Sequence, residues 1–205
     1  MQFRTSVALN GMSELGQKTD ISRVDGVSVL EVVFFRPGKV IMNAEGLLRV
    51  ARGIVDKVAM PLSITVGPEG EANARVVQTS KLSDDWTVRF MTDRRSRKAH
   101  EVGRTGRMTL AYQCDAENSY VTLVGRAKVV DDVEVKKAIW SPASFKWHPG
   151  GPTDPNVVLI DFVAYRIELW SSVHGITPDP IKGLWAAALS REREGWRPHL
   201  TLPSG

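Results

Sequence analysis

The densest run of basic side chains in the chain follows a predicted strand and opens a predicted helix. The segment Phe90-Met91-Thr92-Asp93-Arg94-Arg95-Ser96-Arg97-Lys98 ends a strand, turns, and begins a helix at or near Ser96. A helix N-terminus presents free N–H groups and a partial positive charge, so it binds phosphate well. Cations do not stabilise a first helical turn, so four basic residues here indicate an anionic ligand. The plain alternative is a solvated basic face.

A second pattern lies upstream, where Arg75 stands at the head of the apolar strand Val76-Val77-Gln78-Thr79-Ser80. The strand follows a predicted hairpin turn at residues 67–70. Its backbone groups could hydrogen-bond a flat polar ring, and the arginine could point to a site beneath the sheet. Taken alone, the pattern does not distinguish such a site from a strand-end arginine in solvent.

Other chemistries find little support. The four histidines show no metal-ligand spacing, so we predict no metal site. No G-x-S-x-G motif occurs, and Ser80 and Ser96 have no paired base in sequence, so the catalytic residues remain unassigned. His100 lies one turn into the predicted helix and could approach a phosphate, but a surface position is the simpler interpretation.

The elements that would position these groups are short strands joined by tight turns, with a few helices between them. Such a pattern predicts a mainly β protein, an antiparallel barrel with flanking helices. Gly125 is expected to mark a bulge in a long strand. The predicted strands cover 27–35, 60–66, 74–80, 86–92, 107–113, 119–130 and 157–171; the predicted helices cover 44–57, 96–103 and 131–147, with a loop at 148–155 and a short helix and tail from Ile181.

The 205 residues suit one domain with appendages. We expect an N-terminal arm over 1–44, a barrel over 45–175, and a C-terminal helix and tail over 176–205. The net charge of +4 permits anionic partners. The single Cys114 rules out an intramolecular disulfide, no secretory pattern opens the chain, and no apolar run is long enough to span a membrane, so we expect a cytoplasmic protein.

Several segments, taken in order, resemble the pyridoxamine 5′-phosphate oxidase-like family of FMN-binding split barrels, and its general-stress-protein branch most closely. The resemblance covers about residues 45–172 and lies in the order and spacing of its segments. These are Arg75 to Ser80, Phe90-Met91-Thr92, Ser96-Arg97-Lys98, Met108 to Tyr112, Tyr120 to Ala127, Asp131-Asp132, Trp147 to Pro152 and Arg166 to Trp170.

This resemblance implies a six-stranded antiparallel split barrel that works as a homodimer, with FMN at the interface. The strand from Arg75 would contact the flavin ring and ribityl chain. Arg97 and Lys98 would hold the phosphate, and Trp170 would approach from the partner subunit. The implied cofactor-binding residues are Arg75, Val76, Val77, Gln78, Ser80, Met91, Thr92, Arg97, Lys98 and Trp170.

The implied function is that of an FMN-dependent oxidoreductase with a small-molecule redox substrate. One alternative is a non-catalytic flavin-binding stress protein. Another is a true pyridoxamine or pyridoxine 5′-phosphate oxidase. The tail from Arg191 to Pro203 favours the latter, whereas Ser80, Ala138 and Pro142 stand where those oxidases carry lysine, tyrosine and arginine.

Two further alternatives concern the ligand. Nucleic-acid binding is not expected, because no strand carries the interleaved surface aromatics that stack bases. Haem or a deazaflavin could occupy such a barrel, but the cluster Ser96-Arg97-Lys98 favours a phosphate-bearing cofactor over haem.

Overall fold

A computed structural model describes residues 16–24, 27–35, 42–177 and 186–200. The chain divides into two units, residues 1–43 and 44–205. In the first unit β1 (Gly16–Val24) pairs antiparallel with β2 (Val27–Phe35), and β2 matches the strand expected there. The strand β1 lies within the expected arm, where no regular element was predicted. Residues 1–15 of that arm lie outside the described residues.

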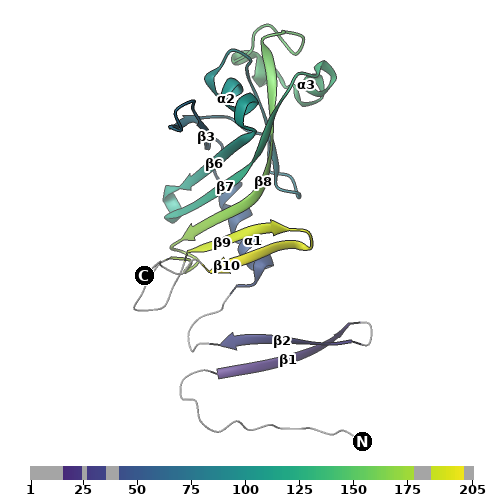
Figure 1. Cartoon of the computed structure of the whole chain (residues 1–205), viewed down its shortest axis with the longest axis vertical. Coiled ribbons are helices and arrows are strands. Elements are labelled where there is room, and N and C mark those ends of the chain that lie inside the picture. Colours follow the sequence, from purple (N-terminus) through teal and green to yellow (C-terminus); the bar gives the residue numbers. More distant parts are fainter. Residues whose placement is uncertain (1–15, 25–26, 36–41, 178–185, 201–205) are drawn as a thin grey trace, which may run out of the picture. The chain divides into compact units, whose positions relative to one another are not determined.

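The second unit is an antiparallel barrel flanked by helices, as predicted (Figure 1). Its described sheet has eight strands in the order β10-β9-β8-β7-β6-β3-β4, with β5 paired to β8. None of the described helices is long and apolar enough to cross a membrane. The elements are α1 (Ala44–Val55), β3 (Leu62–Val66), β4 (Ala72–Val76), β5 (Thr87–Asp93), α2 (Arg97–Thr105), β6 (Arg107–Cys114), η1 (Asp115–Glu117), β7 (Ser119–Val130), α3 (Val133–Ile139), η2 (Pro142–Lys146), β8 (Val157–Ser171), β9 (Ala187–Glu192) and β10 (Gly195–Leu200).

The strand β8 closes the barrel, because it pairs with three other strands. Its first half pairs with β5, its second half pairs with β9, and β7 runs along nearly its whole length. The alternating apolar residues of these strands form the core. Val121 and Leu123 of β7 are fully buried. The predicted bulge is also present, as a register shift between Val124 and Gly125.

Three elements differ from their predictions. The helix predicted over 131–147 is divided into α3 and the 3-10 helix η2, because the chain is extended at Trp140, just before Ser141 and Pro142. The strand β4 ends at Val76, so the predicted strand over 74–80 is shorter than expected. Residues 77–80 are not part of a strand, although the Ser80 N–H donates to the Arg89 carbonyl of β5 at 2.8 Å.

A short helix and a tail were predicted from Ile181. Residues 178–185 lie outside the described residues, and residues 187–200 form the hairpin β9–β10, which was not predicted. Local sequence did not indicate this hairpin because β9 pairs with β8, which is distant in sequence.

Contacts between aromatic and basic side chains hold this hairpin against the rest of the barrel. The Trp86 and Trp196 rings meet edge-on with centroids 5.7 Å apart. The Arg52 guanidinium lies 5.1 Å from the Trp86 ring centroid, and Arg191 donates to the Asp85 carbonyl at 2.9 Å. Trp86 is 4% exposed and has a positive φ of 64°, and it contacts Arg52 of α1 and Trp196 of the hairpin.

The bulge at Gly125 gives a prediction about stability. A methyl group there would lie 2.4 Å from the Phe162 ring and from the Val163 carbonyl oxygen, so the backbone would have to move. Overpacking of this kind costs about 1–3 kcal/mol. We expect Gly125→Ala to lower the urea midpoint of unfolding accordingly.

Gly103→Ala is the matched control. Gly103 lies within α2 and a methyl group there would meet nothing within 4 Å. Alanine favours helix by about 1 kcal/mol over glycine, so this variant should be as stable as the parent or more stable. Equal midpoints for the parent and Gly125→Ala would contradict the close approach at the bulge.

Candidate functional site

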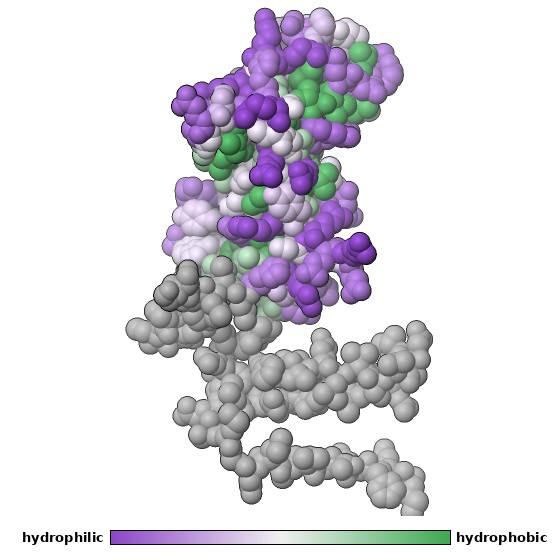
Figure 2. Space-filling model, in the orientation of Figure 1, coloured by the Kyte–Doolittle hydropathy of each residue, from purple (hydrophilic) through white to green (hydrophobic). Residues whose placement is uncertain are grey.

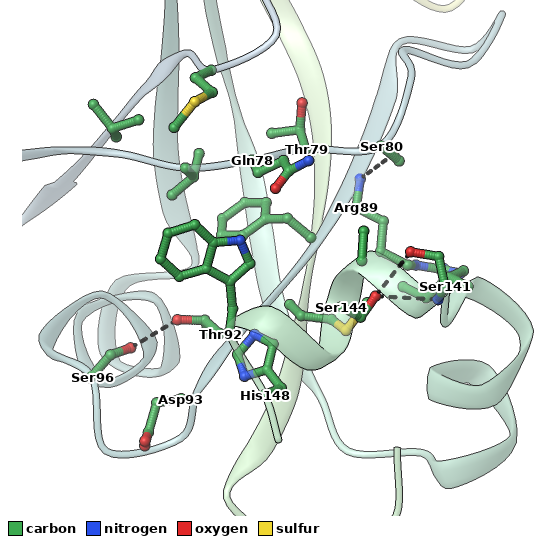
Figure 3. A pocket seen from close by; sticks show the side chains of 18 of the residues that line it. Gln78, Thr79, Ser80, Arg89, Thr92, Asp93, Ser96, Ser141, Ser144 and His148 are labelled. Atoms are coloured by element: carbon green, nitrogen blue, oxygen red, sulfur yellow. Dashed lines mark hydrogen bonds between the residues drawn. The ribbon is translucent and has the colours of Figure 1, made fainter. Parts of the chain in front are cut away.

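A cavity of about 490 Å³ opens where β5 meets the N-terminus of α2 (Figure 3). One wall is the chain that follows β4, and another is the end of β5. The third is the segment from the end of α3 through η2. The lining residues are Met60, Val76, Val77, Gln78, Thr79, Ser80, Arg89, Phe90, Met91, Thr92, Asp93, Ser96, Lys98, Ile139, Ser141, Ala143, Ser144, Trp147 and His148.

The turn between β5 and α2 aims the helix N-terminus at the cavity. Ser96 caps the helix, and its hydroxyl accepts a bond from the Ala99 N–H at 3.3 Å. The Thr92 and Ser96 hydroxyls lie 3.2 Å apart, which connects the helix cap to the end of strand β5 (Figure 3). Gly106 ends the helix with a left-handed φ of 61°. The helix predicted over residues 96–103 is therefore present over nearly those residues.

Lys98 is the cation that this helix presents to the cavity. Its side chain is half-buried on the cavity wall. Burial lowers the pKa of Lys98, and the nearby positive charge of Arg75 lowers it further, while Asp93 acts in the opposite direction. No described residue forms a salt bridge or side-chain hydrogen bond with it. A desolvated cation without a counter-ion favours an anionic ligand.

Two arginines that the resemblance assigned to the cofactor, Arg75 and Arg97, are turned toward a buried carboxylate. Glu101 of α2 is only 3% exposed and accepts hydrogen bonds from Thr65 and from Asn73 Nδ2, the latter at 2.8 Å. Arg75 Nη2 lies 3.4 Å from Glu101 Oε2, and Arg97 Nε lies 3.8 Å from Oε1. Neither arginine lines the cavity. Both still hold positive charge close to the N-terminal half of α2.

The pKa of Glu101 reflects a balance of opposing effects. Burial is the largest and raises the pKa. The hydrogen bonds from Thr65 and Arg75, with the charges of Arg75 and Arg97, outweigh burial and hold the pKa below its usual range. Glu101 is therefore an anion that anchors α2 to the hairpin β3–β4.

The structure brings seven of the ten expected cofactor residues to the cavity wall. Arg75 and Arg97 lie on the Glu101 cluster instead. Trp170 lies on β8 beside Tyr120 of β7, with ring centroids 5.3 Å apart, and neither ring lines the cavity. The seven are Val76, Val77, Gln78, Ser80, Met91, Thr92 and Lys98.

Sequence reasoning missed the segment from Ser141 to His148 as a cavity wall. Trp147 is 62% exposed on that wall, and His148 is half-buried. Figure 2 shows a hydrophobic patch with a hydrophilic rim on the part of this face where Figure 1 places α3. The signal that could have located this wall was a pair of tryptophans flanking a short polar segment after a helix.

A buried lysine holds that wall in place. Lys136 of α3 is 1% exposed, and its Nζ donates to Asp131 Oδ1 at 3.1 Å and to the Val157 carbonyl at 2.9 Å. Arg94 pairs with Asp131 from the other side and donates to the Pro155 carbonyl at 2.9 Å. These contacts join the turn before α2, the start of α3 and the loop before β8.

The family described as "Pyridoxamine 5′-phosphate oxidase like" matches residues 49–192 of this chain. The chain belongs to that family. The matched residues run from α1 through β9 and include every described wall of the cavity.

Individual relatives agree with this assignment. The chain is 29% identical to general stress protein 26 of Bacillus subtilis (strain 168) over 134 residues, which is 64% of this chain and 93% of the relative. A protein from Clostridium acetobutylicum related to general stress protein 26 superposes with a TM-score of 0.56 at 19% identity, over 63% of this chain and 91% of its own.

A more distant neighbour has the same architecture. A pyridoxamine 5′-phosphate oxidase-related, FMN binding protein from Nostoc punctiforme PCC 73102 superposes with a TM-score of 0.57 at 14% identity, over 77% of this chain and 96% of its own. These superpositions establish the fold. The predicted split barrel is confirmed, with the hairpin β9–β10 added to the six strands β3–β8.

The Glu101 cluster gives a prediction about stability and pH. Glu101→Gln removes a buried charge that two arginines face, so it should cost about 2–4 kcal/mol at pH 7. Because the folded-state pKa lies below the unfolded value of 4.5, the parent holds this stabilisation above pH 4.5 and loses it as pH falls through the folded pKa. Urea unfolding from pH 7 to pH 4 should show the difference shrinking at the acidic end.

Glu134→Gln is the control, because Glu134 is exposed on α3 and pairs only with exposed Lys137. It should change the free energy of unfolding by about 0.5 kcal/mol or less. A Glu101→Gln variant that matches this control at pH 7 would contradict the anchoring role of Glu101.

Proposed function

We propose that this chain binds FMN in the cavity and acts as an FMN-dependent oxidoreductase on a small-molecule substrate that is not yet assigned. The observation that carries the proposal is Lys98, a half-buried cation on the cavity wall with no anionic partner among the described residues. It stands at the N-terminus of α2, where free N–H groups also favour a phosphate.

The donor set fits a flavin phosphate. The hydroxyls of Thr92 and Ser96 share the cavity wall with Lys98. Arg75 and Arg97 do not line the cavity, but they add positive charge near it from their positions beside Glu101. Bound FMN would supply hydride and electron transfer. The chain would supply binding, orientation and exclusion of water.

The remaining cavity fits the apolar, flat part of such a cofactor. Val76, Val77, Phe90 and Met91 contribute apolar wall, and Gln78 is placed to reach polar ring atoms. The wall from Ser141 to His148 carries Ser141 and Ser144 but contributes no lysine or arginine to the cavity lining. For that reason we do not extend the proposal to a phosphorylated substrate such as the B6 vitamers.

We further propose that the working unit is a homodimer in which the partner completes each site. Exposed Tyr120 and half-buried Trp170 form an aromatic pair on β7 and β8, outside the cavity of their own chain. Tyr120 is 36% exposed, and a partly exposed aromatic pair of this kind is typical of an interface. A second copy could bring its pair to the open side of the cavity.

The phosphate site can be tested by substitution. An absorption spectrum after FMN loading and dialysis should show bound flavin, at about one per chain. Arg97→Ala with Lys98→Ala should then weaken FMN binding, because each charge-assisted contact contributes about 1.5–3 kcal/mol. Most of the loss should already appear in Lys98→Gln, since of these two residues only Lys98 lines the cavity.

The control is Lys137→Gln, which removes one exposed charge from α3, away from the cavity wall. It should bind FMN like the parent in a fluorescence titration. Tight FMN binding by the Arg97→Ala, Lys98→Ala double variant would refute the phosphate site, and a parent protein that takes up no flavin would refute the function.

The shared site can be tested with mixed dimers. Lys98→Gln and Trp170→Ala should each bind FMN poorly alone. If partners complete each other's sites, a mixed dimer contains one doubly altered site and one intact site. Statistical exchange should therefore restore FMN binding at about a quarter of all sites.

Restoration would be measured as bound flavin after unfolding and refolding the two variants together. The control mixes each variant with itself, which should restore nothing. A mixture no better than its separate components, although gel filtration shows that dimers have exchanged, would mean that Trp170 acts within its own chain or not at all.

A further inference from the structure

His148 is the titratable group of the cavity that the phosphate site leaves unused. It follows η2 and lies half-buried on the cavity wall. Figure 3 shows it on the side of the cavity that holds Thr92, Asp93 and Ser96. The Trp140 ring, 6.3 Å away between centroids, backs the imidazole. No described residue forms a side-chain hydrogen bond with its ring.

The charged groups around His148 come from three elements. Asp93 of β5 and Asp154 of the loop before β8 favour its charged form, and Lys98 of α2 opposes it. Both carboxylates are already engaged. Asp93 accepts bonds from Arg95 at 2.7 Å, which hold the Asp93 pKa to about 2, and Asp154 accepts the Asn156 N–H at 2.8 Å.

These influences leave the imidazole neutral near pH 7 before a ligand binds. Burial has the largest effect and lowers the pKa of His148 below 6.5. The two carboxylates raise this pKa by part of that amount, and the charge of Lys98 lowers it further. The neutral imidazole therefore lies near Lys98 and can take up a proton without breaking any hydrogen bond with a described residue.

We propose that His148 is a second cationic ligand for the phosphate of the bound cofactor and becomes charged when that phosphate binds. The inference rests on the proposed function. A phosphate monoester carries about −1.5 to −2 charges at neutral pH and accepts several hydrogen bonds. An anion of that charge beside Lys98 would favour the imidazolium, as any close opposite charge does.

The expected consequence is proton uptake on binding. The pKa of His148 lies below 6.5 in the free protein and would be raised in the complex. Between those two values the binding constant falls as pH rises, by up to tenfold per pH unit. The phosphate itself titrates near pH 6 and weakens binding below that. Measurements above pH 7 therefore separate the titration of the histidine from that of the phosphate.

The experiment compares FMN with riboflavin, which has the same ring and ribityl chain but no phosphate. Fluorescence titrations of the full-length parent at pH 7.0 and pH 8.5 should show FMN affinity falling by about threefold to tenfold, with riboflavin affinity unchanged. Calorimetry at pH 7.0 in buffers of different ionisation enthalpy should show proton uptake with FMN only.

His148→Gln should abolish both effects and bind FMN at pH 7.0 as the parent does at pH 8.5. His100→Gln is the matched control, because His100 is exposed on α2 and does not line the cavity; it should behave as the parent. Retained riboflavin binding would establish that His148→Gln is folded.

Three outcomes separate the ideas. An FMN affinity that does not change between the two pH values would overturn the role of His148 while leaving the FMN site intact. A pH dependence that survives in His148→Gln would also overturn it and would point to Lys98. Failure of the parent to bind either flavin would remove the proposed function and this inference together.

Discussion

The buried carboxylate of Glu101 is the contact on which the cavity depends. It projects from α2 into the hairpin β3–β4, where Thr65, Asn73 and Arg75 donate to it. A charge with 3% exposure is tolerated only because these donors and Arg97 surround it. The contact fixes α2 on the barrel, and with α2 it fixes the direction in which the helix N-terminus and Lys98 point.

The same contact divides the basic residues into two groups. Arg75 and Arg97 are engaged by Glu101, so their charge acts on the cavity only at a distance. Lys98 is left on the cavity wall without a counter-ion, and its pKa is lowered by burial and then by Arg75. An anion entering the cavity would relieve that unfavourable state, and this gives the site its preference for negative charge.

The far wall depends on a second buried charge. Lys136 joins α3 to Asp131 and to the Val157 carbonyl, and Arg94 links Asp131 to the turn before α2. These contacts join α3, which precedes the segment that carries Trp147 and His148, to the turn before α2 and to the start of β8. The Glu101 cluster therefore positions α2 and the Lys136 cluster positions α3, and both helices adjoin the cavity.

The sequence by itself determined most elements of the barrel and the family. Hydrophobic alternation placed β7, β8 and the bulge at Gly125, and the serine cap with its following helix placed α2, because these patterns depend on neighbours within a few residues. The order of segments along the chain was also sufficient to indicate the split barrel. Seven of the ten expected cofactor residues line the cavity because they lie at the end of β4 and just after it, on β5 and on α2, whose positions follow from that barrel.

Only the tertiary structure decided where the charges and the last hairpin go. Arg75 and Arg97 turn to Glu101, an ion cluster between separate elements that no local spacing encodes. The hairpin β9–β10 was not predicted, and it forms because β9 pairs with an edge of β8. His148 follows α3, which Lys136 anchors to Asp131 and to the Val157 carbonyl. In each case a partner that is distant in sequence decides the outcome, and local propensity carries no information about such partners.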